Sequence, residues 1–383
     1  MTRSWKSEFS RFLGAAPGRL HFAAHSHHLW PDVSFEAHQQ AWLDAARLAD
    51  DKWDHVFGEV MPAAAKHVAT ELHLPDARSI AFAPNTHEFV LRLLSCLPER
   101  PTLVTSDSEF HSFERQTRRL EEEGARVVRV PSEPFATFPE RLVAAAKQGA
   151  DLVFFSQVFF NSGAVVEGLA GLINALPERT MAVVDGYHGF CAVPTDLSAL
   201  ASRAFYVAGG YKYAMTGEGA CFLHVPAWAD SLRPRNTGWF AAFGALEEKV
   251  AGRVGYAAGG GRFLGATFDP SALYRFNAIM AWRQRVGLTT AATRAHAHAL
   301  QEQFVAQLPK GKLAAGQLVV PVTDSRRGQF LTFRTPEART LSAALKGKHV
   351  ITDARDDRLR FGFGPYVDAD DVGAVASILS ALS

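Results

Sequence analysis

The chain has 383 residues, which is enough for two or three structural units with sizeable hydrophobic cores. Its formal net charge is +1 and charged residues make up 21%, a balance that excludes a broad basic surface for nucleic acid or anionic membranes. The three cysteines are widely spaced and the N-terminus has no apolar signal core, so neither a disulfide framework nor secretion is expected. We therefore expect a cytoplasmic protein without nucleic-acid or membrane partners.

The first part of the chain predicts alternating strands and helices. Helical spacing runs from residue 59 to residue 73, the apolar run Ile80 to Ala83 ends at Pro84, and a helix is predicted over 87–97. Further apolar runs, separated by helix-like stretches, predict strands over residues 102–106, 126–130, 151–155, 181–185, 204–208 and 220–225. Because these runs are continuous rather than alternating, they are typical of a mostly parallel sheet with helices on both faces.

The remainder of the chain predicts an irregular segment and a second, smaller unit. Residues 233–265 are rich in Gly, Arg and aromatic residues and are predicted to be irregular. A long helix over 271–307, interrupted near Gly287, is expected to lead into an open α+β unit with strands over 318–322, 330–334 and 359–363. We therefore predict an N-terminal segment (1–58), a large domain (59–270) and a small C-terminal domain with its linking helix (271–383).

Two segments that follow predicted strands could bind a phosphate and cover a planar ligand. Ligands of such sheets bind outside the carboxyl ends of the strands. Asn85, Thr86 and His87 lie where a strand leads into a helix, whose free backbone N–H groups and positive partial charge suit a phosphate. A simple helix cap is the alternative. Phe110 follows the next strand and could lie over a planar ligand, although packing within its loop is the alternative.

Two further segments carry an acid and a lysine. Asp185 ends a fully apolar strand, where a carboxylate is costly unless it meets a donor or a cation, such as a protonated pyridine nitrogen. A helix cap or a structural ion pair is the alternative. Lys212 lies between aromatic residues in a Gly-rich loop, where desolvation and a nearby cation would lower its pKa and make its amine a nucleophile towards aldehydes. An ordinary surface lysine is the alternative.

Taken in order, these segments resemble the class V aminotransferase superfamily of fold type I enzymes that use pyridoxal 5'-phosphate (PLP), and most closely its kynureninase branch. The Asp-x-x-His motif of these proteins is matched by Asp185 and His188, and their Ser-Tyr-Lys-Tyr motif by residues 210–213, with Lys212 at the lysine. The resemblance runs from about residue 20 to the C-terminus. It implies an α/β fold of type I, with a large PLP-binding domain and a small C-terminal domain.

The resemblance also implies a role for each matching residue. Lys212 would form the Schiff base with PLP, Asp185 would pair with the pyridinium nitrogen, and His188 would lie near the phenolic oxygen. Further cofactor contacts are implied for Thr86, His87, Phe110, Ser112, Ser156 and Tyr211. Trp239 and Thr267 would reach the cofactor of the neighbouring subunit, so a homodimer with shared active sites is expected. Arg360 would grip the α-carboxylate of the substrate.

Some residues depart from the kynureninase pattern in the region that shapes the substrate pocket. Kynureninases carry Asn-Ser-Leu-Gly where this chain has His25-Ser26-His27-His28, and Gly-Trp-Trp where it has Gly238-Trp239-Phe240. The histidine cluster does not match a usual zinc spacing, so no metal is expected. We therefore expect a PLP-dependent enzyme acting on an amino acid, either a transaminase or a kynureninase-like lyase, with kynureninase proper, which hydrolyses the Cβ–Cγ bond of L-kynurenine, as the alternative.

Two rival hypotheses belong to other classes of protein. The first is a catalytically inactive, PLP-binding regulatory module. The second is a dinucleotide-binding domain, suggested by the glycines at 259–261. A dinucleotide motif requires a preceding strand within a βαβ unit, and the sequence predicts no such strand.

Overall fold

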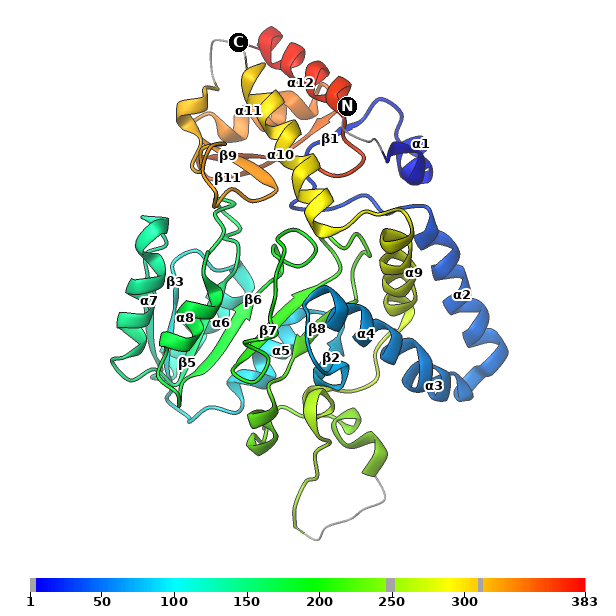
Figure 1. Cartoon of the computed structure of the whole chain (residues 1–383), viewed down its shortest axis with the longest axis vertical. Coiled ribbons are helices and arrows are strands. Elements are labelled where there is room, and N and C mark those ends of the chain that lie inside the picture. The colour runs from blue at the N-terminus through cyan, green and yellow to red at the C-terminus, as the bar shows by residue number, and fades with distance from the viewer. Residues whose placement is uncertain (1–4, 246–251, 309–312, 383) are drawn as a thin grey trace.

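The computed structural model describes residues 5–245, 252–308 and 313–382, which form a large unit around a seven-stranded sheet and a smaller unit beside it (Figure 1). The strands of the large sheet lie in the order β2-β8-β7-β6-β5-β3-β4. Their bounds are β2 (Ile80–Ala83), β3 (Thr102–Ser106), β4 (Arg126–Val130), β5 (Leu152–Ser156), β6 (Met181–Asp185), β7 (Ala204–Gly209) and β8 (Cys221–His224). Strands β7, β6, β5, β3 and β4 run parallel, whereas β8 is antiparallel to both of its neighbours.

Helices cover both faces of this sheet, as the sequence predicts. One face packs against α4 (Met61–Glu71), α7 (Phe138–Ala146), α8 (Leu169–Ala175) and α9 (Ser271–Arg285). The opposite face packs against α5 (Thr86–Leu94) and α6 (His111–Glu122). Every residue of β5 and β7 is buried, which explains why their sequences are continuously apolar. Helices α2 (Val33–Leu48) and α3 (Lys52–His55) lie outside α4 and α9 (Figure 1).

The smaller unit is built on a three-stranded antiparallel sheet. Its strands lie in the order β11 (Asp353–Arg355), β12 (Arg358–Gly362) and β9 (Phe330–Arg334). Its helices are α10 (Thr290–Ala306), α11 (Ala338–Lys346) and α12 (Ala369–Leu382). Gly287 has a φ of 70° and separates α9 from α10 at the predicted interruption. Both observations agree with the prediction of a linking helix followed by a small α+β unit.

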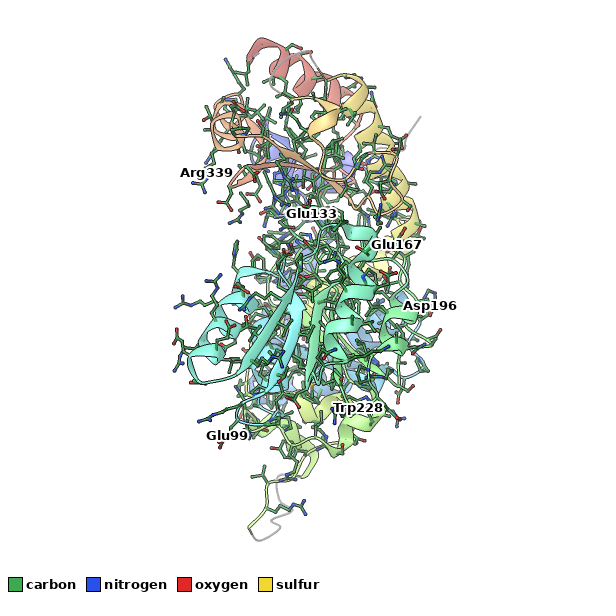
Figure 2. The ribbon with its side chains drawn as sticks, turned by 90° about the vertical axis from the view of Figure 1, so that its left-hand side faces the viewer. Glu99, Glu133, Glu167, Asp196, Trp228 and Arg339 are labelled. Carbon is green, nitrogen blue, oxygen red and sulfur yellow. The ribbon has the colours of Figure 1, made fainter. Side chains whose placement is uncertain are left out.

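The N-terminal segment packs against this smaller unit. Strand β1 (Leu20–His21) pairs in parallel with β10 (Val350–Ile351), and Phe9 and Phe22 are buried in the core of the same unit. The two units are also joined through Glu133, which accepts a hydrogen bond from Arg334 at 2.8 Å at their junction (Figure 2). The division at residues 58 and 270 stays a prediction.

The prediction of a strand over 318–322 is wrong. Leu318 makes only an isolated bridge to Phe333. A proline at 321 has no N–H to donate to a sheet, which explains why the ladder does not continue. The irregular stretch 233–265 contains the short 3₁₀ segments η7 (Trp239–Ala245) and η8 (Gly259–Phe263), and residues 246–251 of it lie outside the described part of the chain.

The glycines at 259–261 begin η8 and do not follow a strand, so they lack the context of a dinucleotide motif. Within the described ranges, no helix combines the length and the apolar character that crossing a bilayer requires.

Candidate active site

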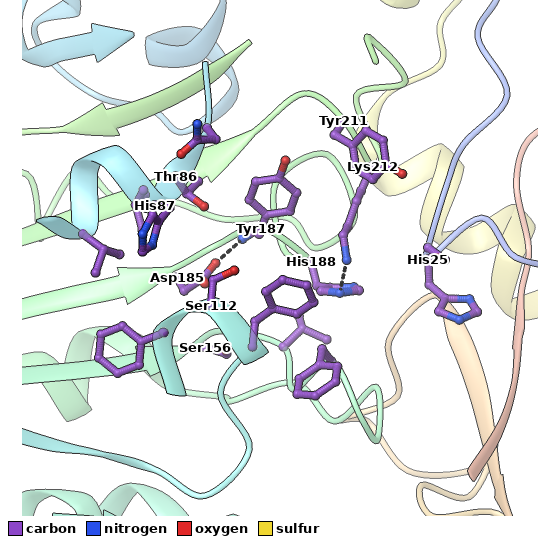
Figure 3. Close-up of a pocket in the computed structure, with 18 of the residues that line it drawn as sticks. His25, Thr86, His87, Ser112, Ser156, Asp185, Tyr187, His188, Tyr211 and Lys212 are labelled. Atoms are coloured by element: carbon purple, nitrogen blue, oxygen red, sulfur yellow. Dashed lines mark hydrogen bonds between the residues drawn. The ribbon is translucent and has the colours of Figure 1, made fainter. Parts of the chain in front are cut away.

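A cavity of about 620 Å³ lies at the carboxyl ends of the parallel strands, between the large sheet and the smaller unit (Figure 3). The residues of the predicted site that line it are Thr86, His87, Phe110, Ser112, Ser156, Asp185, His188, Tyr211, Lys212 and Arg360. Those from Thr86 to Lys212 meet because the parallel strands end at the same edge of the sheet, whereas Arg360 comes from the smaller unit. Of the predicted site residues, Trp239 and Thr267 do not line this cavity.

Asp185 ends β6 in the centre of the sheet. It lies in register with Ser156 of β5, so the two side chains reach the cavity from adjacent strands. Its Oδ1 accepts a hydrogen bond from the backbone N–H of Tyr187 at 2.8 Å. Burial raises the pKa of Asp185 to about 6, even though this hydrogen bond and the charge of Lys212 oppose the rise. A carboxylate in this environment would be stabilised by a further cationic donor, such as the N–H of a pyridinium ring.

Lys212 extends from the loop after β7 into the same cavity. Its Nζ donates to Nε2 of His188 and lies 5.9 Å from the ring centroid of Phe110 and 5.6 Å from that of Tyr187. Burial and then the positive charge of Arg360 lower the pKa of Lys212 from its usual 10.5 to about 7. Near neutral pH this amine is therefore available in its unprotonated, nucleophilic form.

The glycine before this loop allows an aromatic ring close to the lysine. A Cβ added at Gly209 would lie 2.6 Å from Sγ of Cys221 and 2.8 Å from the ring of Tyr187, so only glycine fits there. Tyr187 also lines the cavity, and it was not among the predicted site residues. Its position between Asp185 and His188, in the segment already singled out, is the signal that could have identified it.

The beginning of α5 forms another end of the cavity. The side chain of Asn85 caps the helix by accepting from the backbone N–H of Glu88 at 3.1 Å, so the capping alternative is correct for this residue. Thr86 and His87 nevertheless line the cavity, and Nδ1 of His87 is buried without a hydrogen-bond partner in the described part of the chain. Tyr211 lines it as well, with its hydroxyl 3.2 Å from Nδ1 of His27. An anion bound here would meet the free backbone N–H groups at the beginning of α5 and the hydrogen-bond donors of nearby side chains.

Arg360 reaches the cavity from the smaller unit. It lies opposite Asp353 in the β11–β12 pair, donates to the carboxylate of that residue through Nη2, and donates to the carbonyl of Phe160 through Nη1. Its Nε is buried and has no hydrogen-bond partner within residues 5–245, 252–308 and 313–382. Burial lowers the pKa of Arg360 to about 10, so the guanidinium still carries its charge at neutral pH. The unpaired Nε–H, with an adjacent Nη–H, can grip a carboxylate in bidentate geometry.

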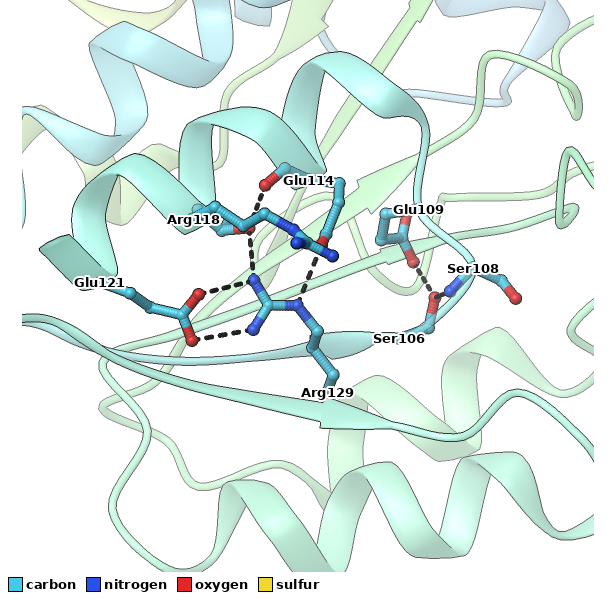
Figure 4. Close-up of polar contacts among 8 residues, drawn as sticks. Ser106, Ser108, Glu109, Glu114, Arg118, Glu121 and Arg129 are labelled. Atoms are coloured by element: carbon cyan, nitrogen blue, oxygen red, sulfur yellow. Dashed lines mark hydrogen bonds and ion pairs between the residues drawn. The ribbon is translucent and has the colours of Figure 1, made fainter.

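Glu109 supports the site from behind and was not predicted as a functional residue. Its carboxylate accepts hydrogen bonds from the hydroxyl of Ser156 at 2.6 Å, from the backbone N–H of Ser156 at 3.1 Å, and from the hydroxyl of Ser106 (Figure 4). Burial raises the pKa of Glu109 to about 7. No local pattern indicates this role, because a glutamate in a loop is normally solvated.

The helix that follows Glu109 is held against the sheet by ion pairs. Arg129 of β4 donates to Glu121 at 2.9 Å and to Glu114 at 3.0 Å, and both acids lie on α6 (Figure 4). These contacts hold α6 along its length, and Phe110 and Ser112 lie at its beginning.

Trp239 and Thr267 lie together outside this cavity. The indole N–H of Trp239 donates to the hydroxyl of Thr267 at 3.3 Å, and Trp239 is 44% exposed. An indole ring of this exposure is available to a second copy of the chain. Their contribution to the cofactor of a neighbouring subunit stays a prediction.

Comparison with known proteins adds independent findings. Residues 293–379 match the family described as the kynureninase C-terminal domain. The chain is 28% identical to a kynureninase from Pseudomonas fluorescens over 298 residues, which cover 74% of this chain and 68% of that protein. It is 29% identical to a kynureninase from Deinococcus radiodurans over 60% of this chain and 57% of that protein.

Among solved structures, the fold matches a variant of C-DES with glycine covalently linked to its PLP cofactor. The TM-score is 0.82 at 16% identity, over 97% of this chain and 98% of that chain. At 16% identity this match shows a shared fold, whereas the matches to kynureninases show similarity in sequence. The chain therefore has the fold of the fold type I PLP-dependent enzymes, and its sequence is similar to those of kynureninases.

Proposed function

We propose that this protein is a cytoplasmic PLP-dependent enzyme that holds its cofactor on Lys212 and acts on an amino acid, as a transaminase or a kynureninase-like lyase. The observation that carries the proposal is that one cavity contains both Lys212 and Asp185. An amine of lowered pKa and a carboxylate at the end of a buried strand are the two groups that a pyridine aldehyde requires from its protein.

The residues of the cavity fit PLP along its whole length. Phe110 is 45% exposed, which is unusual for a large apolar side chain and leaves its ring free to cover the pyridine. The phosphate would be held at the start of α5 by Thr86 and by His87, whose Nδ1 has no other partner among the residues described. Asp185 would accept the N–H of the pyridine nitrogen. Bound in this way, PLP supplies an electron sink for charge at Cα of the substrate.

Lys212 would serve first as the covalent attachment point and then as the base that moves the Cα proton. Both tasks need a neutral amine, which its lowered pKa provides near pH 7. His188 would accept a hydrogen bond from that amine and orient it, because burial and the nearby Lys212 hold the pKa of His188 well below its usual value and keep its ring neutral.

Arg360 would set the orientation of the substrate by binding its α-carboxylate. This role follows from the buried Nε, which has no hydrogen-bond partner among the residues that the structure describes. A carboxylate gripped there presents Cα towards Lys212, since both residues line the same cavity. The fixed orientation would determine which bond to Cα breaks.

The homodimer is part of this proposal. The exposed indole of Trp239, with Thr267 beside it, would complete the phosphate site of the partner subunit. A Trp239→Ala variant is expected to remain a dimer and to bind PLP more weakly, because the partner site loses a hydrogen-bond donor worth about 0.5–1.5 kcal/mol. Sedimentation and a PLP titration measure the two properties, and unchanged PLP affinity in a stable dimer would contradict the assignment.

The proposed function is tested with purified protein and PLP. We expect a visible absorbance band that borohydride bleaches in the wild type and that is missing in Lys212→Ala. A panel of amino acids then separates the activities, because transamination releases the matching keto acid, whereas kynureninase activity releases anthranilate from L-kynurenine. A bleachable band without turnover of any amino acid would instead favour the inactive regulatory module.

A further inference from the structure

His25 is a buried residue of the cavity that the proposed mechanism leaves without a task. It lies between β1 and α2, is 0% exposed, and lines the cavity together with Lys212 and Arg360 (Figure 3). Its ring stacks on that of Phe330, with centroids 4.7 Å apart and planes at 23°. The guanidinium carbon of Arg360 lies 5.9 Å from the centroid of the same phenyl ring. The imidazole therefore occupies a fixed position beside the expected carboxylate site.

The backbone around His25 is shaped to admit its ring. A Cβ added at Gly362, in β12, would overlap Nδ1 of His25, so a larger residue at 362 would displace the imidazole. The close approach of β12 holds the ring on one side, and Phe330 holds it on the other. This side chain has little freedom to turn towards another partner.

Neither nitrogen of this imidazole has a hydrogen-bond partner within the described part of the protein. The nearest carboxylate oxygen is Oδ2 of Asp353, which lies 3.7 Å from Nε2 and already accepts from Arg360. Leaving a buried polar group unpaired costs about 1–3 kcal/mol. Such a group at the wall of a cavity points to a ligand that supplies the missing partner.

The ring is also neutral. Burial, followed by the charges of Arg360 and Lys212, holds the pKa of His25 well below its usual value. A neutral imidazole carries one N–H donor and one acceptor nitrogen. Two cations, Arg360 and Arg355, line the same end of the cavity, and Nε of Arg360 also has no hydrogen-bond partner among the described residues. The carboxylate of Asp353 already pairs with both arginines, so an acceptor supplied by a ligand would suit this end of the cavity.

We infer that His25 is the residue that determines substrate specificity, and that it donates a hydrogen bond to an oxygen acceptor on the side chain of the substrate. This inference rests on the proposed function and narrows its substrate class to amino acids whose side chain carries a carbonyl, amide or carboxylate oxygen. An amino acid held by its α-carboxylate at Arg360 lies beside His25, since both residues contact Phe330. An apolar side chain would leave the imidazole unpaired and is therefore selected against.

Substrate preference in the wild type provides the first test. Keto acid or cleavage product is measured for asparagine, glutamine, aspartate, glutamate and kynurenine, and for the apolar alanine, 2-aminobutyrate and norvaline. We expect the best oxygen-bearing substrate to exceed the best apolar one about tenfold or more in kcat/KM. The amide and carboxylate pairs distinguish a neutral acceptor from a charged one, and a preference for either supports the inference. Equal use of the apolar amino acids, or a preference for them, overturns it.

Two variants of His25 provide the second test. His25→Phe keeps an aromatic ring against Phe330 and removes the donor, whereas His25→Gln keeps an N–H donor. We expect His25→Phe to raise KM for the preferred substrate about tenfold, as for a lost hydrogen bond to a desolvated group, while the apolar substrates change little. His25→Gln is expected to recover part of the loss. An equal loss on all substrates would mean that the role of His25 is structural and would overturn the inference.

The outcome is separable from that of the proposed function. The borohydride-sensitive band is measured in the same preparations, and we expect it to be unchanged in both variants. Absence of this band in the wild type would refute the proposed function itself. If His25→Phe does not fold, the His25→Gln enzyme still tests the inference. A change in its ranking of substrates by kcat/KM supports the inference, and an unchanged ranking overturns it.

Discussion

The rate at which the apoprotein captures PLP is expected to depend on the protonation of Lys212, because only a neutral amine attacks an aldehyde. The pKa of Lys212 is lowered from 10.5 to about 7, mainly by burial and then by Arg360. At pH 7 an ordinary lysine is neutral in about one molecule in 3,000, whereas a lysine with a pKa near 7 is neutral in about half. Capture by Lys212 is therefore expected to be about a thousandfold faster at pH 7 than capture by an unperturbed lysine.

The assay is the growth of the visible absorbance band after apoprotein and excess PLP are mixed at a series of pH values. The rate constant is expected to rise with pH and to level off just above pH 7. Free Nα-acetyl-lysine, measured in the same buffers, corrects for the titration of PLP itself. A rate that continues to rise about tenfold per pH unit beyond pH 9 would refute the argument, because it would indicate an ordinary lysine pKa.

A pair of variants tests the cause of the lowered pKa. Arg360→Gln removes the cation that opposes protonation of Lys212, so the inflection of the profile is expected to move to higher pH. Arg358→Gln is the matched control, because Arg358 lies on the same strand but bonds to the carbonyl of Asn161 and does not line the cavity. An inflection that moves equally in both variants would mean that the charge of Arg360 is not responsible.

Three other predictions concern the neighbours of Lys212. Asp185→Asn is expected to keep the borohydride-sensitive band but to lower kcat about tenfold or more, since a hydrogen bond to a charged group contributes about 1.5–3 kcal/mol. An unchanged kcat in steady-state kinetics would contradict the pairing of Asp185 with the pyridine nitrogen. Arg360→Lys is expected to raise KM about tenfold or more with little effect on kcat, because lysine cannot grip a carboxylate in bidentate geometry, and an equal loss in kcat would argue against simple binding. Glu109→Ala is expected to lower the free energy of unfolding by about 1–3 kcal/mol for each serine hydroxyl that loses its acceptor. Denaturant titration measures this change, and a stability equal to that of the wild type would show that water replaces the carboxylate.

The alternation of strands and helices was predictable because it rests on local patterns. Continuous apolar runs such as 151–155 and 204–208 correspond to β5 and β7, which are buried on both faces. Lys212 and Asp185 could be singled out for a similar reason, since a charged group next to such a run has no water to meet and requires a partner. The glycine that interrupts the long helix at 287 could also be read locally.

Other features depended on residues distant in the sequence. The antiparallel direction of β8 is set by its pairing with β7 and β2, and the run 318–322 has strand-like residues but a proline where a ladder would need an N–H. The surroundings of Glu109 could not be foreseen, because its partners Ser106 and Ser156 belong to two different strands.

The sequence by itself thus determined the order of the elements and the residue types that chemistry at a buried strand end requires. Only the tertiary structure decided that Arg360 joins Lys212 in one cavity and that His25 is buried there with no hydrogen-bond partner among the described residues. The physical reason is that periodicity reports which faces are apolar, whereas the pairing of a polar group depends on which distant groups the packed units bring within hydrogen-bonding distance.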